Sequence, residues 1–72
     1  MKNFGERVKF YREKAGMTQE ELAKRMGYSH KSSITKIEKG IHDLPLSKVR
    51  QLARILGVSE GALMGWDCDG KG

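Results

Sequence analysis

Positive charge and hydroxyl groups are concentrated in one short stretch of the sequence. Lysine can neutralise a phosphate or donate a hydrogen bond to guanine, and serine and threonine hydroxyls can bond base edges or phosphate oxygens. Taken alone, such residues are more typical of a solvated surface than of a binding site, so the element that carries them decides what they do. The residues are Lys31, Ser32, Thr35, Lys36 and Lys39.

Two isoleucines indicate how this stretch is oriented. Ile34 and Ile37 are its only apolar residues, and at 3.6 residues per turn they mark the inward side of a helix at about 31–39. The lysines and hydroxyls then lie on or beside the opposite side. Ser29 or His30 would cap the start of this helix. With only two buried contacts it cannot be stable alone, so it must lie on its neighbours with a broad polar face outward.

The titratable and nucleophilic residues do not form a recognisable active site. His30 and His42 are twelve residues apart, and Cys68 is the only cysteine, so no spacing fits a metal site. The clustered serines have no base and orienting group nearby. Glu20 and Glu21 fall in the first turn of an expected helix, where carboxylates complement the helix dipole. We therefore expect no enzymatic activity, no metal and no cofactor.

Length and composition favour one small helical domain with an anionic partner. The chain has 72 residues, 38% of them hydrophobic, with a net charge of +5 and a pI near 9.6. This balance favours nucleic acid or an acidic membrane surface as partner. The single cysteine fits a reducing cytoplasm, and no apolar run approaches the ~20 residues of a membrane span. We expect residues 1–66 to form the domain and residues 67–72 a polar flexible tail or a linker.

Apolar spacing and glycines predict five helices. The spacing of Phe4, Val8, Tyr11 and Ala15 indicates the first helix, which Gly16 ends. Thr18 with Glu21 three residues later forms a capping box that starts the second helix. The expected ranges are 3–15, 19–26 and 31–39, then a fourth helix from Pro45 to Leu56 and a fifth from Ser59 to Met64. The strongest apolar stripe is Leu46, Val49, Leu52, Ala53 and Leu56.

The second and third helices are the informative pair. Gly27 permits a sharp turn between them, and Ala23 lies where they must approach closely. This construction presents one helix on the outside of a small body. The major groove of B-DNA, about 12 Å wide, admits a helix of that size.

Three segments in register carry a resemblance to a known family. They are Thr18-Gln19-Glu20-Glu21-Leu22-Ala23, Ile34-x-x-Ile37-Glu38-x-Gly40 and Leu56-Gly57-Val58-Ser59. Together they resemble the Cro and phage-repressor type of helix-turn-helix domain (the XRE family), over roughly residues 4–66. The resemblance implies an all-α, compact five-helix bundle similar to lambda repressor. The segment from Gly27 to Ile34 is one residue longer than in many members. It resembles phage repressors in which the sequence leading into the third helix is Gly-Tyr-x-x-x-Ser-Ser-Ile.

The resemblance also implies a function and a role for each site residue. The chain would be a phage- or prophage-type transcriptional repressor that inserts its third helix into the major groove, as a homodimer on a pseudo-palindromic operator. Arg12 and Glu38 would form a structural ion pair. The residues facing base edges would be Lys31, Ser32, Thr35 and Lys36, and those near the DNA backbone would be Gln19, His30, Lys39 and His42.

The sequence leaves open several alternatives for the function and for the roles of two aromatic residues. The same fold could serve as an antitoxin or adaptor that binds a protein partner, although the lysines of the third helix argue against this. The chain could be the DNA-binding part of a longer repressor with a C-terminal domain. Trp66 could cover the open end of the core, or Val58 to Trp66 could form a dimer contact. Phe10 lies off the stripe of its helix and is expected to pack on a neighbouring segment, the C-terminal helix being one candidate.

Overall fold

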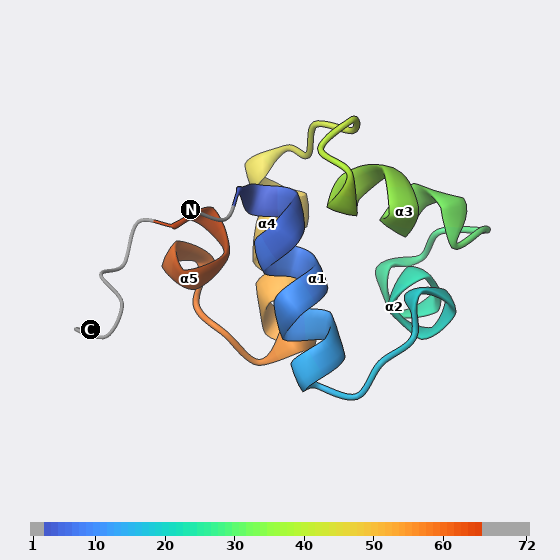
Figure 1. The fold of residues 1–72 in the computed structure, drawn as a ribbon, viewed down its shortest axis with the longest axis horizontal. Helices are drawn as coiled ribbons and strands as arrows, with labels where there is room; N and C mark the ends of the chain where they lie inside the picture. Colours follow the sequence, from blue (N-terminus) through green and yellow to red (C-terminus); the bar gives the residue numbers. More distant parts are fainter. Residues whose placement is uncertain (1–2, 66–72) are drawn as a thin grey trace.

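The computed structural model describes residues 3–65, and within this range every regular element is a helix (Figure 1). The helices fall close to the ranges expected from the sequence, which confirms the all-α bundle. They are α1 (Phe4–Lys14), α2 (Gln19–Met26), α3 (Ser32–Glu38), α4 (Leu46–Leu56) and α5 (Glu60–Met64).

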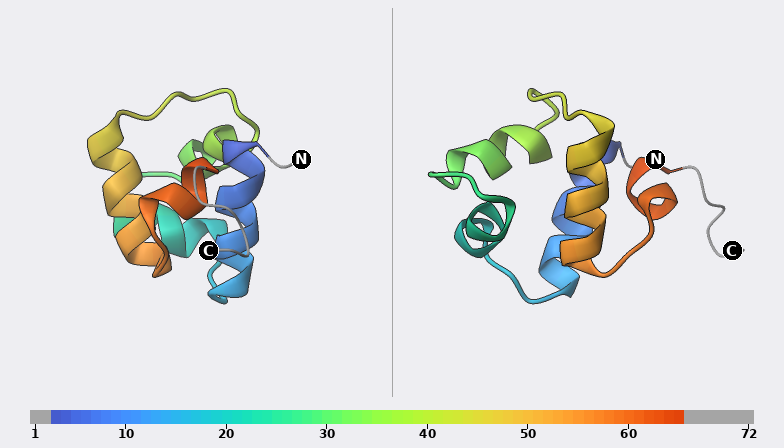
Figure 2. Two further views of the ribbon diagram at one scale, coloured as in Figure 1. Left: turned by 90° about the vertical axis from the view of Figure 1, so that its left-hand side faces the viewer. Right: turned by 180° about the vertical axis from the view of Figure 1, so that it is seen from behind.

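The helices contact one another in a closed order around a single core. α1 packs on α3 and α5, α2 packs on α3 and α4, and α4 packs on α5. Figures 1 and 2 show α2 and α3 together on the side of the molecule that is farthest from α5. α3 is thus held by two neighbours and keeps a face turned away from the body.

The core consists of the apolar stripes expected from the sequence, with two exceptions. Ala15, expected in the stripe of the first helix, is the exposed C-cap residue of α1. Leu46 is 49% exposed, so its placement in the buried stripe of α4 was wrong. It is the first residue of the helix, and at 100° per residue it lies about 70° from the centre of the stripe that points inward. The fully buried side chains are Val8, Leu22, Ile34, Ile37, Leu52 and Leu63.

Helix ends are fixed by local hydrogen bonds. The Thr18 hydroxyl accepts from the Glu21 amide at 3.0 Å, and the Glu21 carboxylate accepts from the Thr18 amide at 3.0 Å, as the capping box predicts. Asn3 and Glu6 form a second capping box at the start of α1. This second capping box was not predicted from the sequence. Gly27 ends α2 with φ +84°, a left-handed conformation that glycine adopts at little cost.

Replacing Thr18 with alanine tests the cap of α2. Loss of the hydroxyl leaves the Glu21 amide without its partner, and substitutions of this kind cost about 1 kcal/mol. We expect the free energy of unfolding, measured by urea denaturation, to fall by about that amount. The control Ser47→Ala, at an exposed position in the first turn of α4, should change it by less than about 0.5 kcal/mol. Equal effects would mean that the capping box adds no stability.

The start of α3 differs from the expectation. The N-cap is Lys31, not Ser29 or His30, and no side chain caps the helix. The amide of Ser33 instead donates to the carbonyl of His30 at 3.2 Å, and the amide of Ile34 donates to that of Lys31 at 2.9 Å. A backbone turn at the start of the helix therefore replaces the side-chain cap.

Phe10, in α1, is 42% exposed. Its ring packs edge-on against Tyr11, with centroids 5.1 Å apart, and the Lys14 ammonium lies 5.6 Å from its centre. The expectations for Trp66, Cys68 and the tail at 67–72 fall outside the described residues. Among the helices of residues 3–65, none is long and apolar enough to cross a membrane.

Candidate nucleic-acid interface

The outer face of α3 is exposed and cationic. Ile34 and Ile37 are fully buried on the inner side, whereas Lys31, Lys36 and Lys39 are exposed. Among residues 3–65, no ion pair uses any of these three lysines. No carboxylate within the described part of the chain pairs with them, which leaves their charges available to a partner.

The other residues predicted from the sequence to contact DNA lie around this face. Ser32 is exposed in the first turn of α3, and His30 is exposed just before it. His42 is exposed in the loop that follows the helix. The structure thus places these residues on or at the two ends of one helix, while Gln19 and Thr35 are partly buried between α2 and α3.

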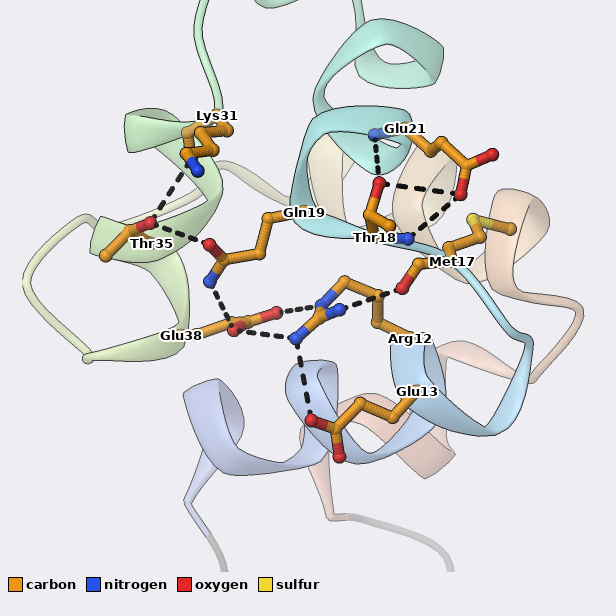
Figure 3. A network of polar contacts seen from close by, with 9 residues as sticks. All are labelled: Arg12, Glu13, Met17, Thr18, Gln19, Glu21, Lys31, Thr35 and Glu38. Atoms are coloured by element: carbon orange, nitrogen blue, oxygen red, sulfur yellow. Dashed lines mark hydrogen bonds and ion pairs between the residues drawn. The ribbon is translucent and has the colours of Figure 1, made fainter.

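A buried ion pair connects α1 to the end of α3 (Figure 3). Arg12 Nε lies 2.6 Å from Glu38 Oε2, and the two side chains are only 10% and 6% exposed. Arg12 Nη1 also donates to the Met17 carbonyl at 2.8 Å, next to the start of α2. The pair that the family resemblance implied is present, and together with the Met17 contact it ties the end of α1 and the start of α2 to the end of α3.

Gln19 extends this ion pair into the outer helix (Figure 3). Its Nε2 donates to Glu38 Oε1 at 3.0 Å, and its Oε1 accepts from the Thr35 hydroxyl at 3.2 Å. The hydroxyl donor on one side and the carboxylate on the other fix the orientation of the Gln19 amide. Gln19 therefore braces α3, and one N–H of its Nε2 remains for a further acceptor.

Thr35 has a more internal contact than the sequence indicated. Its hydroxyl hydrogen is directed to Gln19 or, at 3.4 Å, to the Lys31 carbonyl. The hydroxyl oxygen can still accept a hydrogen bond. Thr35 thus belongs to the support of α3 at least as much as to its outer face, and no sequence pattern signals this because Gln19 lies in a different helix.

Gly5 is a structural residue that sequence reasoning missed. It is buried in α1, and a methyl group added there would lie 2.7 Å from the Ile37 carbonyl oxygen and closer still to that of Glu38. Only a residue without a side chain allows α1 to approach the last turn of α3 this closely. The available signal was a glycine inside an expected helix, where it costs about 1 kcal/mol relative to alanine.

Within residues 3–65, no group of three or more histidine, cysteine, aspartate or glutamate side chains could hold a metal ion. The arrangement offers hydrogen-bond donors and positive charge on a rigidly supported helix. Such groups suit recognition of an anionic surface.

Comparison with known proteins gives a consistent result. The family model described as Helix-turn-helix matches residues 8–63. An uncharacterized HTH-type transcriptional regulator of Methanocaldococcus jannaschii is 41% identical over 58 residues, which are 81% of this chain and 82% of that protein.

Solved structures agree with the family match. The restriction-modification controller protein C.AhdI from Aeromonas hydrophila has a TM-score of 0.77 and 30% identity, over 85% of this chain and 87% of that chain. The P22 c2 repressor in complex with a synthetic operator has a TM-score of 0.82 and 25% identity, over 93% of this chain and 100% of that chain.

Proposed function

This chain belongs to the helix-turn-helix family, of the Cro and phage-repressor type, and from this we propose that it binds specific duplex DNA sequences and represses transcription. The family is a class of transcription-regulator domain and not a class of enzyme. In the proposed complex, α3 enters the major groove, and residues 1–66 act as the DNA-binding unit.

One observation carries the proposal: the lysines of α3 are exposed and unpaired by other described residues, on a helix whose opposite side is fully buried. A free cationic helix face on a rigid support is what a polyanionic groove requires. Lysine binding to phosphates releases counterions and positions the domain, and groups that reach base edges then provide sequence preference.

We assign the side chains to two roles in this complex. Base edges would be contacted by Lys31, Ser32 and Lys36, with Thr35 accepting a hydrogen bond while it donates to Gln19. The DNA backbone would be contacted from both ends of α3, with the free N–H of the Gln19 amide directed at a phosphate. The backbone set is Gln19, His30, Lys39 and His42.

A single domain of this size reads few base pairs, so we propose that it acts as a homodimer. Two copies related by a twofold axis would place their outer helices about 34 Å apart along the duplex, one helical turn. The operator would then be pseudo-palindromic, with two half-sites at that spacing.

An antitoxin or adaptor function through a protein partner is less well supported. Protein interfaces are depleted of charged residues at their centre, especially lysine. Within α3 the outer face carries Lys36 and no exposed apolar residue, and exposed lysines, Lys31 and Lys39, cap the two ends of the helix. This composition favours DNA.

The decisive experiment is selection of bound sequences from random duplex DNA, followed by affinity measurement over a series of salt concentrations. We expect an enriched motif with two related half-sites and an affinity that falls steeply with salt. Failure to enrich any motif at moderate salt would contradict sequence-specific binding. Stable capture of a protein partner that covers α3 would support the adaptor function.

Lys36→Ala tests whether α3 recognises the DNA sequence. Loss of one base contact is worth about 1–3 kcal/mol, so we expect affinity for the selected site to fall by about 5- to 150-fold. The matched control is Lys14→Ala, which removes the same charge at the end of α1, beside Gly57 and Val58. Equal losses for the two variants in a binding titration would show that α3 does not read the site.

A further inference from the structure

The C-terminus of α3 is closed by a tight backbone motif. Gly40 adopts φ +78°, its amide donates to the Ile37 carbonyl at 3.1 Å, and the amide of Ile41 donates to the Lys36 carbonyl at 2.9 Å. The His42 amide also points to the Lys36 carbonyl, at 3.4 Å. These bonds fix the backbone of Ile41 beside Lys36, one turn back along the helix.

In this motif an apolar residue at the position of Ile41 ordinarily packs on an apolar residue five or six positions earlier, in the last turns of the helix. Here those positions hold Lys36 and Thr35. Ile41 is 69% exposed, more than any other large hydrophobic residue among those described, and it is not packed on the core. The motif therefore holds an isoleucine in solvent at a fixed place.

The surroundings of Ile41 indicate what could cover it. Lys36 and Lys39 are exposed close by in the chain, and both contact DNA in the proposed complex. A protein interface would have few lysines around its apolar centre. In the major groove, by contrast, the 5-methyl group of thymine is an apolar surface that lies among hydrogen-bond acceptors and near phosphates.

We propose that Ile41 contacts the 5-methyl group of one thymine, at the edge of the base pairs read by Lys36. This inference rests on the proposed function, because it requires α3 to lie in the major groove. It adds a specificity determinant outside the helix itself. Ile41 would favour thymine over cytosine at one position of each half-site without a hydrogen bond.

The test pairs a protein substitution with removal of the methyl group from the DNA. In the selected site each thymine is replaced in turn by deoxyuridine, and binding is titrated with the wild type and with Ile41→Ala. We expect one position per half-site at which deoxyuridine weakens wild-type binding about fourfold, the effect of burying one methyl group. For Ile41→Ala the same replacement should have no effect.

Matched controls separate this contact from general effects. Leu46→Ala removes another half-exposed apolar side chain and should leave the fourfold effect of deoxyuridine unchanged. Because Ile41 is exposed, its alanine variant should fold normally, which thermal unfolding verifies. The sedimentation coefficient of Ile41→Ala without DNA should equal that of the wild type.

The outcomes distinguish this inference from the proposed function. If no sequence is enriched by selection, the proposed function fails. A second outcome is that a sequence is enriched, but deoxyuridine at every thymine position weakens binding of Ile41→Ala as much as it weakens binding of the wild type. In that case only the role of Ile41 is overturned. A change in sedimentation for Ile41→Ala would likewise overturn it and would assign the residue to a contact between protein chains.

Discussion

Replacing Arg12 with methionine is expected to lower the free energy of unfolding by about 3 kcal/mol, because removal of one partner from a buried ion pair leaves the other charge uncompensated. The carboxylate of Glu38, whose side chain is 6% exposed, would keep only the Gln19 amide as a partner among residues 3–65. The Met17 carbonyl would also lose its donor. Such a loss is a large part of the 5–15 kcal/mol that stabilises a typical domain. Urea denaturation followed by circular dichroism measures it.

Two further variants identify the cause of that loss. The double variant with Arg12→Met and Glu38→Leu should recover much of the stability, because hydrophobic replacement of a whole buried pair is often neutral. Glu13→Ala removes a carboxylate that is 58% exposed and 3.8 Å from Arg12, and it should cost less than about 1 kcal/mol. If Arg12→Met and Glu13→Ala had equal effects, the pair with Glu38 would be no more than a surface contact.

Most of the fold could be predicted from the sequence because its signals are local. The capping box of Thr18 and Glu21 involves residues within one turn, and Gly27 marks a backbone conformation that few other residues adopt. Apolar spacing places the buried side of each helix. Leu46 shows the limit of that spacing, since a residue at the edge of a stripe is buried or exposed according to how the neighbouring helix is placed.

The candidate site was predictable in outline but not in detail. Ile34 and Ile37 determine which side of α3 faces inward, and so which lysines face outward. The partners of Thr35 and the first residue of α3 could not be predicted, because both depend on contacts and turns outside the helix. The resemblance to a family supplied the pairing of Arg12 with Glu38, which spacing alone does not give.

The polar contacts explain why so short a helix can carry a binding face. Hydrogen bonds run from Arg12 of α1 through Glu38 and Gln19 to Thr35 in the middle of α3 (Figure 3). They hold the second half of α3, in addition to its two buried isoleucines. A site held on a rigid element loses less conformational entropy on binding than one on a mobile segment.

Gly5→Ala should destabilise the domain although alanine favours helices. The higher helix propensity of alanine alone would raise the free energy of unfolding by at most about 1 kcal/mol. The new methyl group, however, would lie 2.7 Å from the Ile37 carbonyl oxygen and closer still to that of Glu38, both backbone atoms that no side-chain rotation can move. Forcing an extra group into a packed contact costs about 1–3 kcal/mol, so we expect a net loss of about 1–2 kcal/mol in urea denaturation.

The same substitution should weaken DNA binding even where the variant is folded. α1 and the last turn of α3 must separate, and that turn carries Lys36 and leads into Ile41. We expect affinity for the selected site to fall several-fold at a temperature where unfolding is negligible. Lys9→Ala, at an exposed position of α1, should change the unfolding free energy by less than about 0.5 kcal/mol. A gain in stability for Gly5→Ala would show that α1 and α3 are not held at this distance.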